Sequence, residues 1–346
     1  MSRSRAPLAA VRRQSDVGLT YLIISGTLWG TGGLTGSLLS RTTELSPVAI
    51  AAYRLAVGGA LIVAFLAVTG RRVPRGRAAW TRIAVFGVLA AVYQACYFGA
   101  VSLTSVSLAT LITIGAAPVL VLAAEAVTGR RRVDRRTAGT SVLALAGLGL
   151  LVGVPAGGVG TVAVLASAGL ALASAAGFAA ITLIGARPVR GLGELAGTGF
   201  AFTMGGLLLA PLAMGTAGLG FTPEPGAIGL LVALGTGPTA VAYLLYFRGL
   251  RTVRPATAAL LALLEPLVGA LLAALLIGDR LGPVGVLGAM LLAAAVVLAA
   301  RQPAVAGEAA TDRGEGRLRG RRLTGPVGTG RRVGGSGRGE EPDQFG

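Results

Sequence analysis

Ten long apolar runs follow one another along the chain, separated by short breaks, most of which carry arginine or glycine. The runs cover residues 18–39, 46–68, 82–102, 105–127, 137–154, 160–184, 194–214, 226–247, 255–277 and 282–300. A helix that crosses a bilayer needs about 20 apolar residues, and the alternation expected of a barrel strand is missing here. The pattern therefore predicts an all-α integral membrane protein with ten transmembrane helices, of which the fifth and tenth are the shortest.

Composition supports a membrane protein. Of the 346 residues, 53% are hydrophobic and 13% are charged, which leaves too little polar surface for a soluble chain of this length. The first run is too long for the apolar part of a cleavable signal peptide and lacks a small-residue cleavage site. We therefore expect it to be the first span.

The basic residues are all arginine, and they gather in alternate breaks. Nineteen lie in segment 1–17 and in or at the edges of the breaks after the second, fourth, sixth and eighth runs, whereas the other breaks hold Arg41 and Arg280. Basic residues are retained on the cytoplasmic side of a membrane. The distribution predicts ten crossings and a multi-pass protein of the plasma membrane, with both termini cytoplasmic.

The net charge of +17 follows largely from this orientation signal beside anionic lipid, so we expect the lipid bilayer and no nucleic acid as a partner. Segment 1–17 is predicted to be a cytoplasmic N-terminal segment. Residues 301–346 are rich in Gly and Arg and poor in apolar residues, which predicts a disordered basic cytoplasmic tail. A tail that binds lipid headgroups or RNA is the alternative.

The residue inventory argues against several classes of protein. Cys96 is the only cysteine and histidine is absent, so we expect no internal disulfide, no metal site and no cofactor. Walker, GxSxG and HExxH motifs are also absent, which argues against an ATP-driven pump, a serine hydrolase and a zinc protease.

The two halves of the chain resemble each other. Tyr97 and Tyr246 each precede a phenylalanine and lie 149 positions apart, as do Gly129 and Gly278. Five runs per unit predict two five-helix repeats, 18–154 and 160–300, in opposite orientations. Inverted repeats of this kind are typical of transporters, whose site lies near the midplane between the halves.

Several motifs together resemble the EamA-type permeases of the drug/metabolite transporter superfamily. They are "LWG" at 28–30, "SPVAIAAYRLAVGGALI" at 46–62, "AAPVLVLAAEAVTG" at 116–129 and "LEPLVGALLAALLIGDRL" at 264–281. The resemblance implies export of a small organic metabolite such as an amino acid or related compound. Family members usually carry an acidic residue after the glycine that closes the fourth and ninth runs; Asp279 matches this pattern and Arg130 departs from it.

Glu265 is the acid deepest in the predicted membrane, about 16 Å from Arg254 along a helix. A charged group at that depth is costly and is a candidate for substrate or proton binding. A protonated Glu265 that bonds a carbonyl freed by Pro266 is the structural alternative. Pro118 and Pro266 are predicted helix breaks, and the latter would offer a carbonyl near Leu261 or Ala262 to a ligand.

Two further charges interrupt apolar runs. Arg54 lies about 12 Å from the predicted outer end of its run. It could pair with Glu265, bind a substrate carboxylate, or anchor its helix to carbonyls. Glu125 is close to the cytoplasmic end of the fourth run, where its side chain could reach the arginines that begin at Arg130.

Polar and aromatic side chains suggest where a substrate pathway runs. Polar-tipped aromatics that face a cavity can shape a pocket for a small solute, and packing between helices is the alternative. Glycines spaced four apart, Gly26 with Gly30 and Gly149 with Gly153, predict close helix approach. With Glu265 and Arg54, the candidates for the pathway are Trp29, Tyr93, Gln94, Tyr97, Thr239, Tyr243 and Tyr246.

Taken together, the residues and the resemblance predict a secondary transporter that moves a small-molecule substrate by alternating access. Protons are a candidate coupling ion, because Glu265 is the best-placed titratable group in a chain without histidine. The alternative is a membrane-embedded enzyme or a non-transporting scaffold, although an enzyme would need a cluster of acids, His or Cys near one interface. The sequence leaves the oligomeric state open, a homodimer included.

Overall fold

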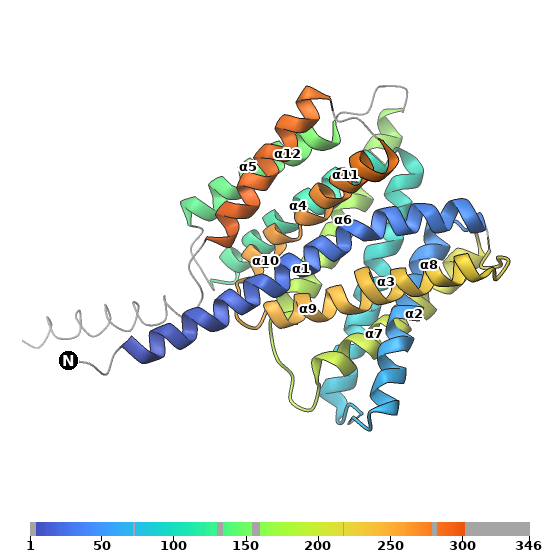
Figure 1. Ribbon diagram of the computed structural model, residues 1–346, viewed down its shortest axis with the longest axis horizontal. Helices are drawn as coiled ribbons and strands as arrows, with labels where there is room; N and C mark the ends of the chain where they lie inside the picture. Colours follow the sequence, from blue (N-terminus) through green and yellow to red (C-terminus); the bar gives the residue numbers. More distant parts are fainter. Residues whose placement is uncertain are drawn as a thin grey trace, which may run out of the picture. The chain divides into compact units, whose positions relative to one another are not determined.

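The computed structural model describes residues 5–71, 73–129, 134–153, 160–216, 218–278 and 282–301, and every regular element among them is a helix (Figure 1). The predicted tail lies outside these residues from 302 onward, as do Asp279 and Arg130. The α-helices and two π-helical segments are α1 (Arg5–Thr43), α2 (Pro47–Val68), α3 (Arg77–Leu103), α4 (Val106–Val127), α5 (Arg135–Val152), α6 (Thr161–Gly185), α7 (Glu194–Met214), α8 (Pro225–Gly235), η1 (Thr236–Val241), α9 (Ala242–Gly249), α10 (Pro255–Leu261), α11 (Leu264–Leu272), η2 (Ala273–Ile277) and α12 (Pro283–Ala300).

The helices follow the predicted runs closely because apolar segments in a bilayer must satisfy their backbone groups internally. Eight helical stretches in the described residues are long and apolar enough to cross a membrane. The first and fifth runs do not join that set: α1 is rich in Gly, Thr and Ser where it should cross, and the 18-residue α5 begins with polar residues. The fold is therefore that of a multi-pass membrane protein, and the count of ten crossings stays a prediction.

The helix that contains the first apolar run extends beyond it, because α1 begins at Arg5 and spans 39 residues, whereas the boundary at residue 18 stays a prediction. The segment before residue 18 contains Ala, Leu and Arg, which are good helix formers and let the helix extend beyond its apolar part. A crossing uses about 20 residues, so α1 is longer than one span requires.

The eighth and ninth runs are interrupted helices, and the two proline predictions have opposite outcomes. Around Pro266 the helix breaks: α10 ends at Leu261, α11 begins at Leu264, and the Glu265 amide donates to the Ala262 carbonyl at 3.0 Å. Pro118 does not break its helix, because α4 continues through it. The missing amide of one proline costs α4 a single backbone bond, which packed neighbours can compensate.

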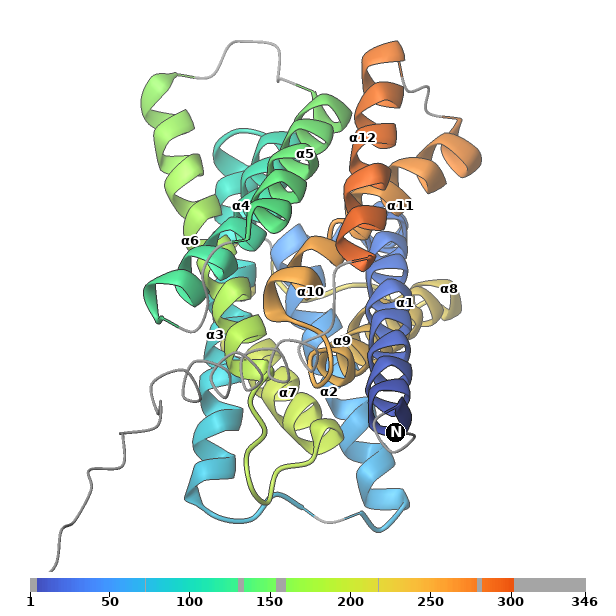
Figure 2. The same cartoon turned by 90° about the vertical axis from the view of Figure 1, so that its left-hand side faces the viewer.

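Helices at equivalent places in the two predicted halves pack in equivalent ways. The second helix of one half packs against the second of the other, α2 on α7, and α5 packs on α12 in the same manner (Figure 1). The first helix of each half lies against the third and fourth runs of the other half: α1 on α9 and α11, and α6 on α3 and α4 (Figure 2). The repeat boundaries themselves stay a prediction.

Glycine allows the closest of these approaches. A β-carbon added to Gly26 would lie 2.8 Å from the Leu261 carbonyl, and one added to Gly30 would lie 3.0 Å from the Glu265 carbonyl. The predicted small-residue contact at Gly26 and Gly30 is therefore present between α1 and the broken ninth run. It fixes the backbone that carries Glu265 directly against α1.

The second glycine prediction is wrong. Among the described residues, no atom of another helix lies within 4 Å of a β-carbon built on Gly149 or Gly153. The contact between α5 and α12 instead uses Gly147 and Gly288, where a β-carbon on Gly147 would lie 2.5 Å from the Leu292 amide nitrogen. Spacing alone did not identify the face of α5 that meets its partner.

Candidate functional site

A cavity of about 470 Å³ lies between α1, α2, α3 and α4, and Leu234 and Glu265 complete its wall. Its lining includes exposed residues at helix ends, among them Arg41, Pro47 and Val106. It also includes buried residues, of which Trp29 is 4% exposed and Gln94 is 5% exposed. The cavity thus extends inward from one end of the helices, which the arginine pattern predicts to be the outer end.

Six of the nine predicted pathway residues line this cavity, and three do not. The lining residues are Trp29, Arg54, Tyr93, Gln94, Tyr97 and Glu265. Thr239, Tyr243 and Tyr246 are buried behind the wall instead. Tyr243 and Tyr246 pack against Trp29, whereas Thr239 contacts Arg54. A part in transport stays a prediction for all nine.

Glu265 lies in the first turn of α11, and its side chain is half-buried on the cavity wall. Within the described part of the chain, no hydrogen bond or ion pair engages its carboxyl group, so the predicted bond to a freed carbonyl is not found. The Leu261 carbonyl faces α1 at Gly26, and the Ala262 carbonyl accepts the Glu265 amide. Neither carbonyl is therefore free to bind a ligand. The Ala262 carbonyl accepts a hydrogen bond within the broken turn, and α1 packs against the Leu261 carbonyl.

Arg54 projects from α2 and is held from behind. Its Nε donates to the Thr239 hydroxyl at 3.3 Å, and that hydroxyl donates to the Leu234 carbonyl at 2.9 Å. No ion pair joins Arg54 to Glu265 among the described residues. The anchor for Arg54 is therefore a threonine hydroxyl in η1, neither a carbonyl nor an acid.

The wall formed by α3 and α4 has its own polar contact. The Tyr97 hydroxyl and the Thr110 hydroxyl lie 2.8 Å apart in a hydrogen bond. Thr110 was missed in the sequence, although Val106, Thr110 and Ile114 recur every four residues and all line the cavity. Arg41, counted only as an orientation signal, also lies at the cavity mouth.

An aromatic cluster forms behind the deepest part of the cavity. The Trp29 ring lies 4.9 Å from that of Tyr243, 5.0 Å from that of Tyr246 and 5.9 Å from that of Phe178, centroid to centroid. The Tyr246 hydroxyl hydrogen-bonds the Thr182 hydroxyl at 2.8 Å. The buried Trp29 Nε1 has no hydrogen-bond partner among the described residues. These rings separate the cavity from the opposite end of the helices.

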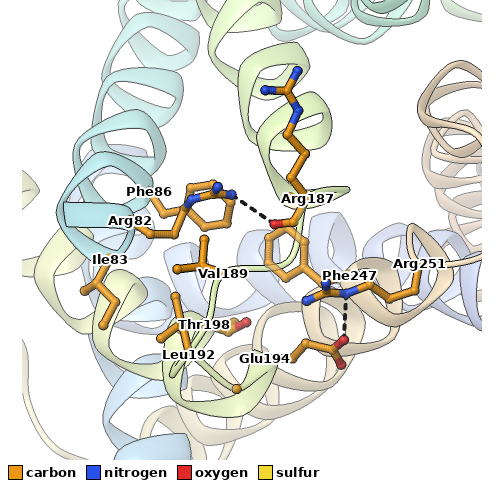
Figure 3. Close-up of a pocket in the computed structure, with 13 residues that line it drawn as sticks. Arg82, Ile83, Phe86, Arg187, Val189, Leu192, Glu194, Thr198, Phe247 and Arg251 are labelled. Carbon is orange, nitrogen blue, oxygen red and sulfur yellow. Dashed lines mark hydrogen bonds and ion pairs between the residues drawn. The ribbon is translucent and has the colours of Figure 1, made fainter. Parts of the chain in front are cut away.

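That opposite end holds a smaller pocket of about 40 Å³ (Figure 3). Glu194 pairs with Arg251 at 2.9 Å and with Arg248 at 3.5 Å. Arg82 donates to the backbone carbonyls of Ile184 and Arg187, at the end of α6. We call Glu194, Arg248 and Arg251 the inner ion pairs, because the arginine pattern predicts this end to be cytoplasmic.

Helix α3 runs past both pockets and gives the length that they cover together. Arg82 lines the small pocket and Val101 lines the large cavity, nineteen residues further along the same helix. That corresponds to about 28 Å at 1.5 Å per residue, close to the thickness of a bilayer core. Glu125 lies near the end of α4, half-buried, and the arginines predicted to pair with it begin at residue 130, outside the described residues.

Comparison with known proteins agrees with this architecture. The chain is 30% identical over 293 residues to "Uncharacterized transporter YwfM" of Bacillus subtilis, which covers 84% of this chain and 96% of that protein. It is 26% identical over 292 residues to "Uncharacterized inner membrane transporter YicL" of Salmonella typhimurium, covering 81% and 94% respectively. A solved crystal structure shares the fold with a TM-score of 0.70 at 21% identity, over 82% of this chain and 96% of that one.

The family assignment rests on two matches within one chain. The sequence pattern of the EamA-like transporter family matches residues 16–153 and again residues 165–301. Together the two stretches include most of α1, all but the first four residues of α6, and the whole of every other helix from α2 to α12. The chain belongs to the EamA-like transporter family and is a membrane transporter.

Proposed function

We propose that this protein exports a small organic solute with one positive and one negative end, such as an amino acid, by alternating access. The observation that carries the proposal is the pair of Arg54 and Glu265 on one cavity wall with no ion pair between them. A solute carboxylate would engage the guanidinium group, and a solute ammonium group would engage the carboxylate.

Energetic reasoning supports a charged solute. Groups of this kind are costly in the membrane interior unless they are paired or reach water, so they favour a ligand that supplies the missing partner. The cavity volume of about 470 Å³ lies in the range of about 300–1,000 Å³ that is usual for small-molecule sites. Gln94, Tyr93 and Tyr97 add neutral polar groups that can orient such a solute.

The closed end supports alternating access. Release of solute at one end and loading at the other require that the aromatic cluster and the inner ion pairs separate while the large cavity narrows. The equivalent packing of the two halves supports this, because two related halves can exchange their conformations. Without a nucleotide-binding motif, an ion gradient or the gradient of the solute supplies the energy, and Glu265 is the candidate proton carrier.

The plasma membrane is the proposed location, with both termini cytoplasmic. A relative named as an inner membrane transporter supports the location, and the arginine distribution supports the orientation. Reporter fusions test it. Fusions after residues 75, 133, 189 and 251 should be cytoplasmic, and fusions after residues 42, 157 and 219 should be external. Reversed results at two or more positions would contradict the ten-span orientation.

A matched set of solutes tests the function. Proteoliposomes are loaded with an amino acid, with the corresponding carboxylic acid lacking the amine, or with the amine lacking the carboxylate. We expect release of the amino acid to exceed release of either partner by about tenfold, because each lost charged contact is worth about 1.5–3 kcal/mol. Mass spectrometry of the released solute distinguishes transport from chemical conversion by an enzyme.

Variants locate the recognition. Arg54→Gln should abolish the preference for the amino acid over the amine. The carboxylate of the amino acid then loses its guanidinium partner, and the amine has no carboxylate to bind. Arg190→Gln is the control, since Arg190 is exposed in the link between α6 and α7. Equal release of all three solutes by the unaltered protein would overturn the proposed substrate class.

A further inference from the structure

We propose that Thr239 is a positioning residue that transmits the state of Arg54 to the inner end of the protein. This inference rests on the proposed function and assigns a mechanism to it. Thr239 does not line the cavity and is 0% exposed, so it cannot touch a solute in this conformation. It does touch Arg54, which lines the cavity.

The Thr239 hydroxyl connects two elements. It accepts a hydrogen bond from Arg54 Nε at 3.3 Å and donates one to the Leu234 carbonyl, five residues earlier, at 2.9 Å. A threonine hydroxyl has one donor and two acceptor positions, so this arrangement satisfies its donor and one acceptor. The five-residue reach spans the start of η1, so the same hydroxyl that holds Arg54 also closes the first turn of the π-helix.

The π-helix η1 is packed closely against α2 on one side and α1 on the other. A β-carbon added to Gly58 of α2 would lie 2.6 Å from the Gly235 carbonyl and 3.0 Å from the Thr239 methyl group. On the other side, Pro238 lies against Gly32 of α1, 3.2 Å from a β-carbon built there. Both glycine-bearing helices form walls of the cavity. A change in the cavity at α1 or α2 therefore reaches η1 through direct contact.

The inner closure begins where η1 ends. Helix α9 follows η1 without a break and carries Tyr243 and Tyr246 into the aromatic cluster. Arg248 at its end and Arg251 just after it pair with Glu194 of α7. The continuous segment formed by α8, η1 and α9 thus contacts Arg54 near its middle, at Thr239. It closes the inner end of the protein where α9 ends.

The chemistry follows from competition for one guanidinium group. A solute carboxylate that accepts a two-pronged bond from Nε and one Nη of Arg54 removes the Nε donor from Thr239. Thr239 is then held only by its bond to Leu234, and η1 can relax to α-helical bonding. A π-to-α change alters the register by one residue, which turns α9 by about 100° and shifts it by about 1.5 Å. That rotation carries Tyr243, Tyr246 and Arg251 away from their present partners.

Two pairs of variants isolate the hydroxyl group. Thr239→Val keeps the shape and removes the hydroxyl, whereas Thr239→Ser keeps the hydroxyl. Thr239→Ser and Thr239→Ala differ from each other only by that hydroxyl and introduce no clash with Gly58, so they preserve the test if the valine variant fails to fold. Each is made in a protein whose native Cys96 is replaced by Ala and whose Thr198 is replaced by Cys.

Thr198→Cys reports on the inner end. Thr198 lines the small pocket and is 2% exposed, so a thiol there reacts with a maleimide only when the inner closure opens. The probe solute is the amino acid released fastest by the unaltered protein. Its equilibrium binding, its rate of export and the rate of thiol labelling are measured for every variant.

In the protein with native Thr239 and in Thr239→Ser, saturating solute should speed maleimide labelling of the thiol by about tenfold. This is the effect of one hydrogen bond to a charged group. With Thr239→Val and Thr239→Ala, the solute should bind with a dissociation constant within about threefold of the unaltered protein, a change smaller than one such bond supplies. Export and the labelling response should both fall by about tenfold in these two variants. A merely structural role would instead lower expression and binding together.

An unchanged labelling response in both variants that lack the hydroxyl would overturn the proposal. So would loss of binding in proportion to loss of export, because Thr239 would then belong to the binding site itself. Failure of the unaltered protein to bind any zwitterionic solute would overturn the proposed function instead. In that case every solute would leave the rate of thiol labelling at the value measured for unliganded protein.

Discussion

Arg54 and Glu265 lie on the wall of one cavity, and no ion pair joins them among the residues that the structure describes. Arg54 comes from the second run of the first half, and Glu265 from the broken ninth run in the second half. In the proposed site a bound solute would have to bridge the two predicted halves, so its binding would be coupled to their relative movement.

Substitutions at Glu265 separate charge from shape. Glu265→Gln keeps the size and hydrogen bonding of the side chain but cannot exchange a proton. We expect it to lower export by about 10²-fold or more, nearly as far as Glu265→Ala, and to flatten the dependence of export on pH. Export is measured in proteoliposomes between about pH 5 and 8, the interval in which coupling to protons is expected to show.

Glu224→Gln is the matched control, since Glu224 is exposed at the start of α8. Export at the unaltered level by Glu265→Gln, with an unchanged pH dependence and normal expression, would contradict a role for Glu265 in proton binding. It would leave Glu265 as a fixed polar group of the wall.

The helices could be predicted from sequence because the bilayer leaves an apolar run of about 20 residues few alternatives. The seventh run, 194–214, has the same bounds as α7. The π-helix η1 could not be predicted, since neither the apolar residues of its run nor the few Thr, Tyr and Pro side chains among them distinguish a π-helical turn from an α-helical one. An α-helical count across η1 placed Thr239, Tyr243 and Tyr246 on one face; all three are buried, the tyrosines against Trp29 and Thr239 against Arg54.

The direction in which that group faces could not be predicted. Spacing determines which residues share a face, whereas the neighbour of that face depends on contacts between helices far apart in sequence. Trp29 of α1 and Phe178 of α6 surround the tyrosines and separate them from the cavity. The small pocket at the inner end was likewise hidden, because Arg82 and Arg251 were accounted for by membrane orientation alone.

The inner ion pairs should bias the protein toward the conformation described here. Glu194→Gln removes the acid shared by Arg248 and Arg251. The pairs are partly exposed, so each contributes about 0–1 kcal/mol and the inner end should open about two- to fivefold more often. Labelling of Thr198→Cys without solute measures this, in a protein whose Cys96 is replaced by Ala.

High salt should mimic that change, because exposed ion pairs are screened at about 1 M ionic strength. Glu224→Gln again provides the control. Labelling of Thr198→Cys that is unaffected by both Glu194→Gln and salt would show that the aromatic cluster alone holds the inner end closed.

The contact between α5 and α12 should be sensitive to a single methyl group. A β-carbon on Gly288 would overlap the amide nitrogen of Leu151 and lie 2.7 Å from the Gly147 carbonyl. Backbone atoms cannot move aside as flexible side chains do, so Gly288→Ala should cost about 1–3 kcal/mol of stability. Gly149→Ala is the control, because no other helix in the described part of the chain comes within 4 Å of its β-carbon. Thermal unfolding in detergent, followed by size-exclusion chromatography, should show a lower midpoint for Gly288→Ala alone, and equal midpoints would refute the close contact.

Trp29 should report directly on occupation of the cavity. The chain has two tryptophans, and Trp80 is 45% exposed and packs on Phe200, away from the cavity. In Trp80→Phe, fluorescence therefore comes from Trp29, which lines the cavity and touches the aromatic cluster. We expect its emission to change with solute concentration and to saturate at the same concentration as export. Trp29→Phe retains Trp80 as the only tryptophan and should show no such change.

Trp29→Phe also tests the indole N–H, which has no hydrogen-bond partner among the described residues. Because this variant keeps an aromatic ring but loses that N–H, it should fold and should bind solutes about three- to tenfold less tightly if the N–H contacts them. A saturable response of equal size from both single-tryptophan proteins would mean that the solute does not bind beside Trp29.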